Sequence, residues 1–534
     1  MRTIRYSAPL GKVCHRQTII ALDRSHPLKV QGGARHHVRR RPRPNGRVRR
    51  ASTAMPQTTV FRRAAWVVAW DEAQGGHVYR RDLDLMIRDR EIAFLGKNCP
   101  ETGDVEIDCS QRLLLPGLIN IHTHPSSEPL RKGITDETRS PGFWHSSLYE
   151  FLTVFNNDRE GSVAAMRVAL AELLMSGVTT VVDISPPFDG WIDTLAESGI
   201  RAVAAPMFRD ARWFTRNGHL LEYAWDVKAG REAFDRACRL IDHASQHPSG
   251  RLSGMMMPSQ IDTCTPELIR DAYDYAVERR LPLQIHASQS VNEFHEMVRR
   301  HGKTPIGWLH SIGALGRNTI IGHGIFLDHH PWLHWPTHGD LPLLRDTGAT
   351  VAHCPTVFMR RGIAMNTFGA YAREGINLGI GTDTYPHNFL EEMRSAFTIS
   401  RAVAGTVDDV TTLDIFNAAT VGGARALLRD DIGRLKVGAK ADLVLVDIKH
   451  PSMMPMREPI RSLLYVAADR AVRDVFVDGE QVVADGRAVN IDYVAASEAL
   501  EEAQKRSMAE VPKLDWAGRT ADQLAPMVLP LVNN

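Results

Sequence analysis

Short apolar runs alternate with longer amphipathic stretches through the middle of the chain, from about residue 116 to residue 428. Runs of this length predict buried strands, and the stretches between most of them predict helices. The predicted strands are 118–121, 179–184, 202–207, 254–257, 283–285, 319–321, 350–352 and 377–380. Eight strands with intervening helices predict a (β/α)8 barrel of the TIM type, which places its chemistry at the carboxyl ends of the strands.

A different pattern flanks this region on both sides. Residues 56–115 and 429–490 contain short alternating runs separated by Gly-rich turns, and Asp478-Gly479 is a hairpin turn signal. We therefore expect one small β-sandwich domain built from an N-terminal part, 56–115, and a C-terminal part, 429–490. Residues 491–534 predict a helix and a polar tail packed outside the barrel.

The first 55 residues have little apolar periodicity. They hold 14 Lys and Arg against the single Asp23, a net charge of +13, so the other 479 residues carry +2 minus 13, or −11. Such a segment is typical of a disordered basic extension. A basic arm for nucleic acid and a transit peptide are alternatives, but we favour an upstream extension with the true start at Met55. Because the rest is acidic, we expect no nucleic-acid partner.

Composition excludes further classes. No run approaches 18 apolar residues, so no membrane span is expected. The six cysteines lack Cys-x-x-Cys spacing, which argues against a disulfide framework or a zinc ribbon and favours a reducing, cytoplasmic location.

Histidines and one aspartate follow several predicted strands. His122 and His124 end the first strand, and because residues i and i+2 point to one side, both imidazoles can reach one metal ion. The alternative is two histidines on one face of an edge strand. His286, His323 and Asp383 follow strands five, six and eight, which favours a hydrolytic metal site with a position open for water.

Other strand-end residues are weaker candidates. His353 is better explained by core packing, whereas Asp183, Arg209 and Asp210 can be pocket residues. The loop 126–149 contains Phe143 and Trp144, and it predicts either a lid over a planar or apolar substrate or an ordinary packed excursion. Phe208, Trp213 and Phe214, after strand three, could wall the same pocket.

An ordered set of motifs spans residues 58–490. It comprises Pro116-Gly117-Leu118-Ile119-Asn120-Ile121-His122-Thr123-His124, Gly177-Val178-Thr179-Thr180, His286, Gly322-His323, His353-Cys354-Pro355, Gly381-Thr382-Asp383 and the later Ile432-Gly433 to Leu443. This set resembles the amidohydrolase superfamily, specifically the branch with the cytosine, guanine and S-adenosylhomocysteine deaminases and the s-triazine hydrolases.

The resemblance implies roles for these residues. His122, His124, His286 and Asp383 would be metal ligands, and His323 a fifth ligand or the residue that orients the attacking water. Asp383 and His323 would be the catalytic residues. The implied cofactor is one divalent ion per subunit, Zn²⁺ before Fe²⁺, Co²⁺ or Mn²⁺. The implied partner is a small-molecule substrate, and we expect a homo-oligomer.

Two departures from the family pattern matter. Binuclear members carry a bridging lysine at the end of strand four, where this chain reads Gly254 to Ser259 without lysine, which favours a single ion. The deaminases carry a proton-shuttling Glu three residues after the strand-five histidine, where this chain has Gln289. An amide cannot relay a proton near neutral pH, although Glu293 or His387 could reach inward instead.

These observations predict a metal-dependent hydrolase of a non-peptide C–N or C–halogen bond in a small amide, urea, carbamate or N-heterocycle. Gln289, Phe143, Trp144, Phe208 and Arg209 are the predicted substrate-binding residues. The alternatives are an aminohydrolase of a heterocyclic base or nucleoside-like substrate and, more remotely, an inactive scaffold of the same fold.

Overall fold

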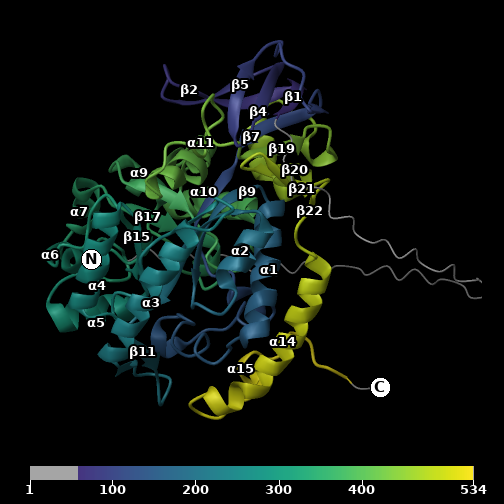
Figure 1. Cartoon of the computed structure of the whole chain (residues 1–534). Coiled ribbons are helices and arrows are strands. Elements are labelled where there is room, and N and C mark those ends of the chain that lie inside the picture. The colour runs from purple at the N-terminus through teal and green to yellow at the C-terminus, as the bar shows by residue number, and fades with distance from the viewer. Residues whose placement is uncertain (1–57, 533–534) are drawn as a thin grey trace, which may run out of the picture. The chain divides into compact units, whose positions relative to one another are not determined.

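The computed structural model describes residues 58–532, and the predicted basic extension at 1–55 lies outside them. Parallel strands and helices alternate through the centre of the chain, so the fold is α/β and of the TIM-barrel type (Figure 1). One parallel sheet has the order β13-β10-β9-β8, with β14 also paired to β10, and the other has the order β15-β16-β17-β18. The strands are β8 (Leu118–Thr123), β9 (Val178–Ser185), β10 (Arg201–Phe208), β13 (Leu252–Gly254), β14 (Met257–Pro258), β15 (Leu283–Ala287), β16 (Thr319–His323), β17 (Thr350–His353) and β18 (Asn377–Ile380).

Parallel bridges join the two sheets at both seams. Met256 pairs with Leu283 at one seam, and Thr123 pairs with Asp383 at the other. At the second seam the Asp383 N–H donates to the His122 carbonyl at 2.9 Å, and the His124 N–H donates to the Asp383 carbonyl at 3.1 Å. The backbone contact between strands one and eight therefore brings these three residues together.

The predicted strand at 254–257 is divided in the structure. Gly254 ends β13, and the pairing with β10 resumes only at Met257 in β14. Between them, Met255 donates to the Ala204 carbonyl at 3.0 Å, and Met256 has turned toward the next strand. The other seven predicted strands lie inside observed ones.

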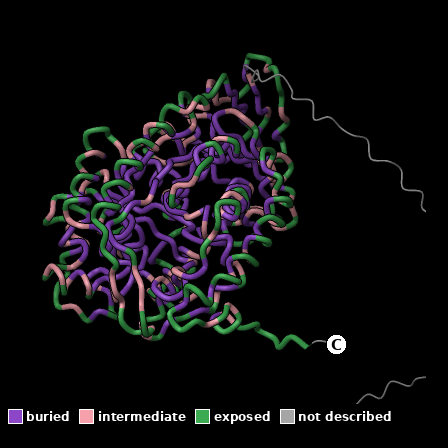
Figure 2. The backbone as a smooth tube through the Cα atoms, turned by 60° about the horizontal axis from the view of Figure 1, so that its bottom comes forward, coloured by how far each residue is buried: buried purple, intermediate pink, exposed green. Residues whose placement is uncertain are grey.

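Helices follow most of the barrel strands. They are α1 (Arg159–Met175), α2 (Trp191–Ser198), α3 (Val227–Ser245), α4 (Pro266–Arg279), α5 (Val291–His301), α6 (Pro305–Ser311), α7 (Asp340–Thr347), α8 (Pro355–Met359), α9 (Phe368–Arg373) and α10 (Phe389–Ala404). The first helix, α1, begins at Arg159, because the Asp158 side chain accepts a hydrogen bond from the Gly161 N–H at 2.7 Å and caps the helix. Figure 2 shows the barrel strands as buried segments, with exposed residues along the outer turns.

Two further sheets come from the flanking segments. The first has the order β5-β4-β1-β6, and the second has the order β22-β21-β20-β19-β7-β2-β3, which combines both ends of the chain. The strands are β1 (Thr58–Ala64), β2 (Trp66–Asp71), β3 (Gly76–Arg80), β4 (Leu83–Arg88), β5 (Glu91–Gly96), β6 (Val105–Asp108), β7 (Arg112–Pro116), β19 (Leu443–Asp447), β20 (Val472–Val477), β21 (Glu480–Ala484) and β22 (Arg487–Ala488). Phe61, Leu85, Leu443 and Phe476 belong to one shared apolar core.

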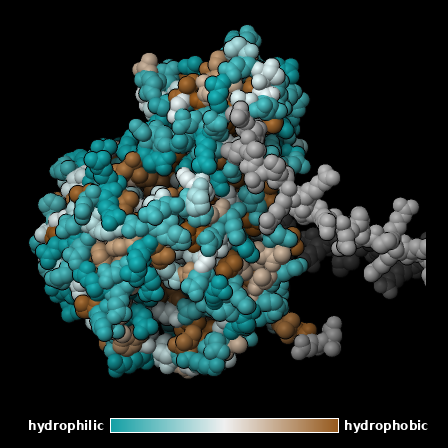
Figure 3. All heavy atoms as spheres, in the orientation of Figure 1, coloured by the Kyte–Doolittle hydropathy of each residue, from teal (hydrophilic) through white to brown (hydrophobic). Residues whose placement is uncertain are grey.

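The remaining helices cover the outside. They are α11 (Thr412–Asn417), α12 (Gly423–Ala426), α13 (Pro459–Ser462), α14 (Tyr493–Leu514) and α15 (Ala521–Leu524). Helix α14 packs along α1, where Leu500 and Ala503 contact Ala164 and Val168 (Figure 1). The face seen in Figure 3 is mostly hydrophilic, with apolar side chains scattered over it. None of the helices in residues 58–532 combines the length and the apolar character that crossing a membrane requires.

Candidate metal and active site

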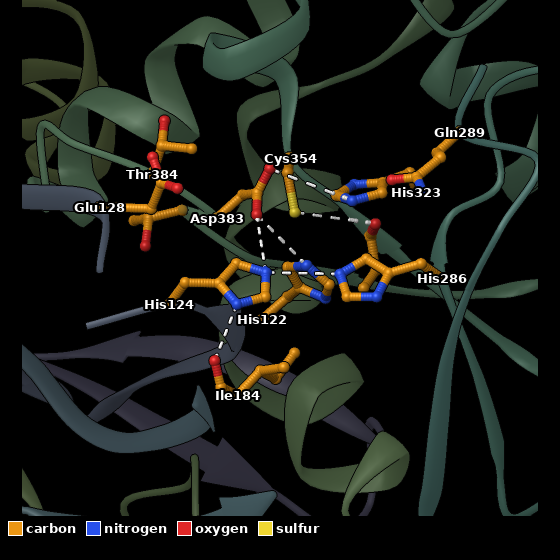
Figure 4. Close-up of polar contacts among 12 residues, drawn as sticks. His122, His124, Glu128, Ile184, His286, Gln289, His323, Cys354, Asp383 and Thr384 are labelled. Atoms are coloured by element: carbon orange, nitrogen blue, oxygen red, sulfur yellow. Dashed lines mark hydrogen bonds and ion pairs between the residues drawn. The ribbon is translucent and has the colours of Figure 1, made fainter. Parts of the chain in front are cut away.

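Four histidines and one aspartate from four strand ends converge on one point (Figure 4). Asp383 Oδ1 lies 3.4 Å from His122 Nε2 and 3.2 Å from His124 Nε2, while Asp383 Oδ2 lies 4.0 Å from His323 Nε2. His286 Nε2 lies 3.3 Å from His124 Nε2. Two sets of atoms from these residues are close enough to hold a metal ion: His122, His286 and His323, and His122, His124 and Asp383. All five predicted metal-site residues are therefore together.

Each of three histidines is oriented through its Nδ1 atom. His124 Nδ1 donates to the Ile184 carbonyl at 2.7 Å, His286 Nδ1 donates to the Ser259 carbonyl at 2.5 Å, and His122 Nδ1 donates to Gln284 Oε1. Carbonyl oxygens only accept, so these contacts place the proton on Nδ1 and leave the Nε2 lone pair free. Metal-binding histidines are oriented in this way.

The cluster also contains polar atoms that make no hydrogen bond. His122 Nε2 and His323 Nδ1 are buried and have no hydrogen-bond partner in the described part of the chain. Leaving a buried polar atom unpaired costs free energy, and a metal ion would satisfy the His122 nitrogen. The donor set, imidazole nitrogens with a carboxylate, is the one that suits a divalent ion such as zinc.

The surroundings shift the pKa values of several groups in the cluster. Burial lowers the pKa of His323 to about 3, and burial together with the neighbouring imidazoles lowers the pKa of His286 well below its usual value. Burial by itself would raise the pKa of Asp383, but the contacts of its carboxylate with His122 and His124 lower it well below its usual value. His286 and His323 are thus held as neutral imidazoles and Asp383 as a carboxylate, the protonation states that metal binding requires. Burial alone would lower the pKa of His124, but the contact with Asp383 outweighs burial and raises it.

Backbone strain and a small residue support this arrangement. His323 and Asp383 have φ values of 84° and 58°, in the left-handed region that non-glycine residues rarely adopt. A Cβ on Gly381 would lie 2.5 Å from the Cβ of His122, so only glycine permits the close approach of strands one and eight.

A cavity of about 680 Å³ opens above the cluster, and His124, His286, His323 and Asp383 are part of its lining. The predicted substrate-binding residues Gln289, Trp144 and Arg209 also line it, as do Trp213 and Phe214. Phe143 and Phe208 do not. They are 0% and 2% exposed and pack against Tyr149 and Phe234 respectively. Their rings are buried in the apolar interior instead of lining the cavity.

The loop 126–149 contributes to this cavity. It includes the short helices η1 (Glu128–Arg131) and η2 (Pro141–Phe143), and the indole of Trp144 beyond them is 52% exposed and lines the cavity. The loop is thus a wall of the cavity rather than an excursion remote from the site.

Several other candidates lie away from the cavity. Glu293 is fully buried and accepts hydrogen bonds from the N–H groups of Ser288 and Gln289 at 2.6 and 3.3 Å, so it anchors the turn after strand five instead of reaching inward. His387 is buried beside Glu172, 3.8 Å away.

Two aspartates and one histidine at strand ends contact neighbouring side chains instead of the cavity. Trp191 Nε1 donates to Asp183 at 2.8 Å, and Thr265 donates to Asp210 at 2.7 Å. His353 is buried and packs against Phe368, as predicted, with a ring separation of 5.7 Å. None of the three is part of the cavity lining in residues 58–532.

Sequence reasoning missed two glutamines. Gln284 lies between Leu283 and Ile285 on a buried strand, two residues before His286 and on the same face. Its position as a polar residue between two apolar ones, on the same face of the strand as His286, was the available signal. Gln260 lines the cavity, and its Oε1 accepts a hydrogen bond from Gln289 Nε2, but its loop carries no recognisable motif.

The barrel and the donor cluster together define a metal-dependent hydrolase. Residues 113–482 match the model of the amidohydrolase family, which is more than half of the chain. The chain belongs to this family.

Curated relatives and solved structures agree with this assignment. A 5-methylthioadenosine/S-adenosylhomocysteine deaminase from Haloarcula marismortui is 28% identical over 439 residues, covering 80% of this chain and 96% of the relative. A 5′-deoxyadenosine deaminase from Methanosphaera stadtmanae is 27% identical over 417 residues, covering 77% and 92%.

Among solved structures, an adenosine deaminase from Xanthomonas campestris with bound zinc has a TM-score of 0.72 at 23% identity, covering 84% of this chain and 98% of that one. An atrazine chlorohydrolase from Arthrobacter aurescens TC1 complexed with zinc has a TM-score of 0.70 at 20% identity, covering 84% and 100%. This chain is accordingly a hydrolase of carbon–nitrogen bonds other than peptide bonds, and a divalent metal fits its site.

Proposed function

We propose that one zinc ion is held by His122, His124, His286 and Asp383, with His323 beside it as a fifth ligand or as the residue that orients water. The observation that carries this proposal is the orientation of three imidazoles by Nδ1 donation, which directs each Nε2 toward Asp383 or a neighbouring imidazole. When bound, such an ion lowers the pKa of a water molecule from about 16 toward 7.

The chain's own residues supply the proton transfers in this proposal. The Asp383 side chain, held as a carboxylate by its contacts with His122 and His124, accepts the proton that the attacking water loses. His323, kept neutral by burial and with its Nε2 4.0 Å from Asp383 Oδ2, takes this proton from Asp383 and passes it to the leaving group. Trp144 offers a flat apolar surface to a planar substrate.

The amide of Gln289 limits the range of leaving groups that the site can serve. Its amide donates to Gln260, and both side chains line the cavity near His286, so this wall offers hydrogen-bonding groups without a proton relay. We therefore propose hydrolysis of a C–N bond, or a C–halogen bond, whose leaving group departs with one proton from His323. Gln289 positions the substrate, which we infer to be a small amide, urea, carbamate or N-heterocycle.

The second candidate is an aminohydrolase of a heterocyclic base or a nucleoside-like substrate. The observation that favours it is the name shared by the curated relatives, which are deaminases of adenosine derivatives. In this case a water molecule or another group must replace the carboxylate relay that Gln289 cannot provide.

The test combines metal analysis with a substrate panel. Purified protein is assayed for release of amine, ammonia or halide from ureas, carbamates, anilides, aminated and halogenated heterocycles, with zinc quantified in each sample. His124→Ala should lose stoichiometric zinc and turnover, whereas His243→Ala, on the exposed face of α3, should change neither. Full zinc occupancy and activity in His124→Ala would contradict the proposed site.

Gln289→Glu separates the two candidates. If the reaction is deamination with a displaced relay, a restored carboxylate should maintain or raise ammonia release. If Gln289 positions an amide, urea or carbamate, the same change should lower that activity, because an ionised carboxylate cannot donate a hydrogen bond.

We also propose that the two flanking sheets form one β-sandwich domain from residues 56–115 and 429–490, beside a barrel domain at 116–428 and a C-terminal helix and tail at 491–534. The shared core around Phe61 and Phe476, whose rings are 5.1 Å apart, supports this division.

A further inference from the structure

The charged residues that line the cavity are unequally paired. Glu128 and Asp383 are its acidic residues, and both have partners: Glu128 forms a buried ion pair with Arg131, and Asp383 contacts the histidines. Arg360 pairs with Asp136 at 3.1 Å. Arginine is therefore in excess over carboxylate on the cavity wall.

Three of the lining arginines have no ion pair with any residue in 58–532: Arg209, Arg212 and Arg361. Arg209 and Arg212 follow strand three and are solvent accessible, so water satisfies their guanidinium groups. Arg361 differs, because it is only partly exposed and its Nε is buried.

The hydrogen bonding of Arg361 is incomplete. Within residues 58–532 its side chain makes one hydrogen bond, from Nη1 to the Val357 carbonyl at 2.6 Å, and its Nε is buried without a partner. A guanidinium that is partly withdrawn from water without a counter-charge is costly. An oxyanion supplies that charge and accepts charge-assisted hydrogen bonds from a guanidinium.

Arg361 follows the strand that lies next to the one before Asp383. It lies just after α8, which begins two residues after His353 at the end of strand seven, next to the strand that ends at Asp383. Burial and the neighbouring Arg360 lower its pKa, while the charges of Glu128, Tyr385 and Asp383 raise it, so its guanidinium lies within the electrostatic field of the site. Arg360, which donates to Thr384 at 2.7 Å, holds the segment in place.

We propose that the substrate of this enzyme carries an anionic oxygen group, a carboxylate or a phosphate, and that the guanidinium of Arg361 on the cavity wall binds it. This inference rests on the proposed hydrolase site and adds the chemical class of its substrate. A neutral substrate would leave the guanidinium of Arg361 without a counter-charge in the complex, whereas an anion on the far end of a molecule held at the cluster would pair it.

The test measures binding without turnover, so its result is independent of whether C–N hydrolysis is ever observed. Benzoate, phenyl phosphate and benzamide are titrated into zinc-loaded protein by calorimetry or ligand-observed NMR. Benzoate or phenyl phosphate should bind at least about tenfold more tightly than benzamide, since a charge-assisted hydrogen-bonded pair is worth about tenfold to a hundredfold in affinity. Tighter binding of one of the two anions identifies the group as carboxylate or phosphate.

Variants then locate the anion. Arg361→Met, which keeps the length of the side chain, should lose that preference and leave benzamide binding unchanged, and Arg361→Lys should restore part of it. Arg212→Met removes the same charge from another lining residue of the same cavity and should change benzoate affinity less than about threefold. A urea unfolding curve for each variant shows that it is folded.

Three results would overturn the proposal. The first is wild-type protein that binds benzamide as tightly as both anions. The second is Arg361→Met that retains the preference for anions, which would place the oxyanion on the metal. The third is an equal loss in Arg212→Met, which would mean that the general positive field, not contact with Arg361, attracts anions.

Discussion

Gln284 should control the affinity of the site for its metal without touching the metal itself. Its Oε1 accepts the Nδ1 proton of His122, and its Nε2 donates to the Ile121 carbonyl at 2.9 Å. In Gln284→Leu the volume is nearly kept, but the imidazole loses the acceptor that selects its tautomer and orientation. Loss of such an orienting partner typically costs about tenfold to a hundredfold in metal affinity, or about 1.4 to 2.8 kcal/mol.

The same change also affects folding. The Nδ1 proton of His122 becomes a buried donor without a partner, which destabilises the protein by about 1 to 3 kcal/mol. Zinc affinity is measured by competition with a chromophoric chelator, and stability by urea unfolding of metal-free protein. Because the two effects are measured separately, weaker zinc binding cannot be mistaken for partial unfolding.

Two further variants complete this experiment. Gln284→Glu keeps an acceptor for His122 and should bind zinc as tightly as the wild type or more so, since a carboxylate makes the imidazole a stronger ligand. Gln246→Leu, an exposed glutamine at the end of α3, should leave zinc affinity unchanged. If Gln284→Leu binds zinc like the wild type, the orientation of His122 does not depend on this hydrogen bond and the reasoning fails.

Three other predictions follow from the same contacts. Arg201→Met should destabilise the protein by about 3 to 5 kcal/mol in urea unfolding, because Arg201 is buried between Asp442 at 3.0 Å and Asp478 at 2.9 Å, and its loss leaves Asp442 without an ion pair and Asp478 with Arg90 alone; a loss below about 1 kcal/mol would contradict this. Burial raises the pKa of Asp183 from 3.8 to about 6, so the unfolded chain loses this proton at lower pH than the folded protein does. The free energy of unfolding therefore falls by about 3 kcal/mol as pH rises from about 4 to 6. Unfolding free energy of Asp183→Asn should lack this decline, and parallel pH profiles for variant and wild type would refute the assignment. Removal of metal with a chelator should lower both Tm and activity, and added zinc should restore both; an unchanged Tm on removal would argue against binding at the cluster.

Local sequence patterns were sufficient to predict the architecture. Buried parallel strands are short continuous apolar runs, and the predicted runs of the barrel fall on β8 to β18, with strand four alone divided. The pattern does not predict β3, where Gly76 begins a strand that pairs with β2. Glycine there closes a hairpin, and the turn and the strand use the same residue.

The histidine and aspartate cluster was predictable from sequence because its members lie at strand ends, and a barrel of parallel strands gathers its carboxyl ends at one rim. His122, His124, His286, His323 and Asp383 needed no knowledge of distance to be grouped. The residues around them could not be found in this way. Gln284 and Gln260 make hydrogen bonds to residues that are 29 to 163 positions away in the chain, as in the hydrogen bonds from Gln289 to Gln260 and from Gln284 to Ile121.

The sequence by itself thus determined the order of elements and the chemical types at the strand ends, since both depend on periodicity within a few residues. Tertiary structure alone decided which side chains are enclosed and which are paired. It buried Phe143 and Phe208 away from the cavity, turned Glu293 into a loop anchor, and left the guanidinium of Arg361 without a counter-charge. Burial and charge pairing depend on what other segments bring to the same place, and that information is not local in the chain.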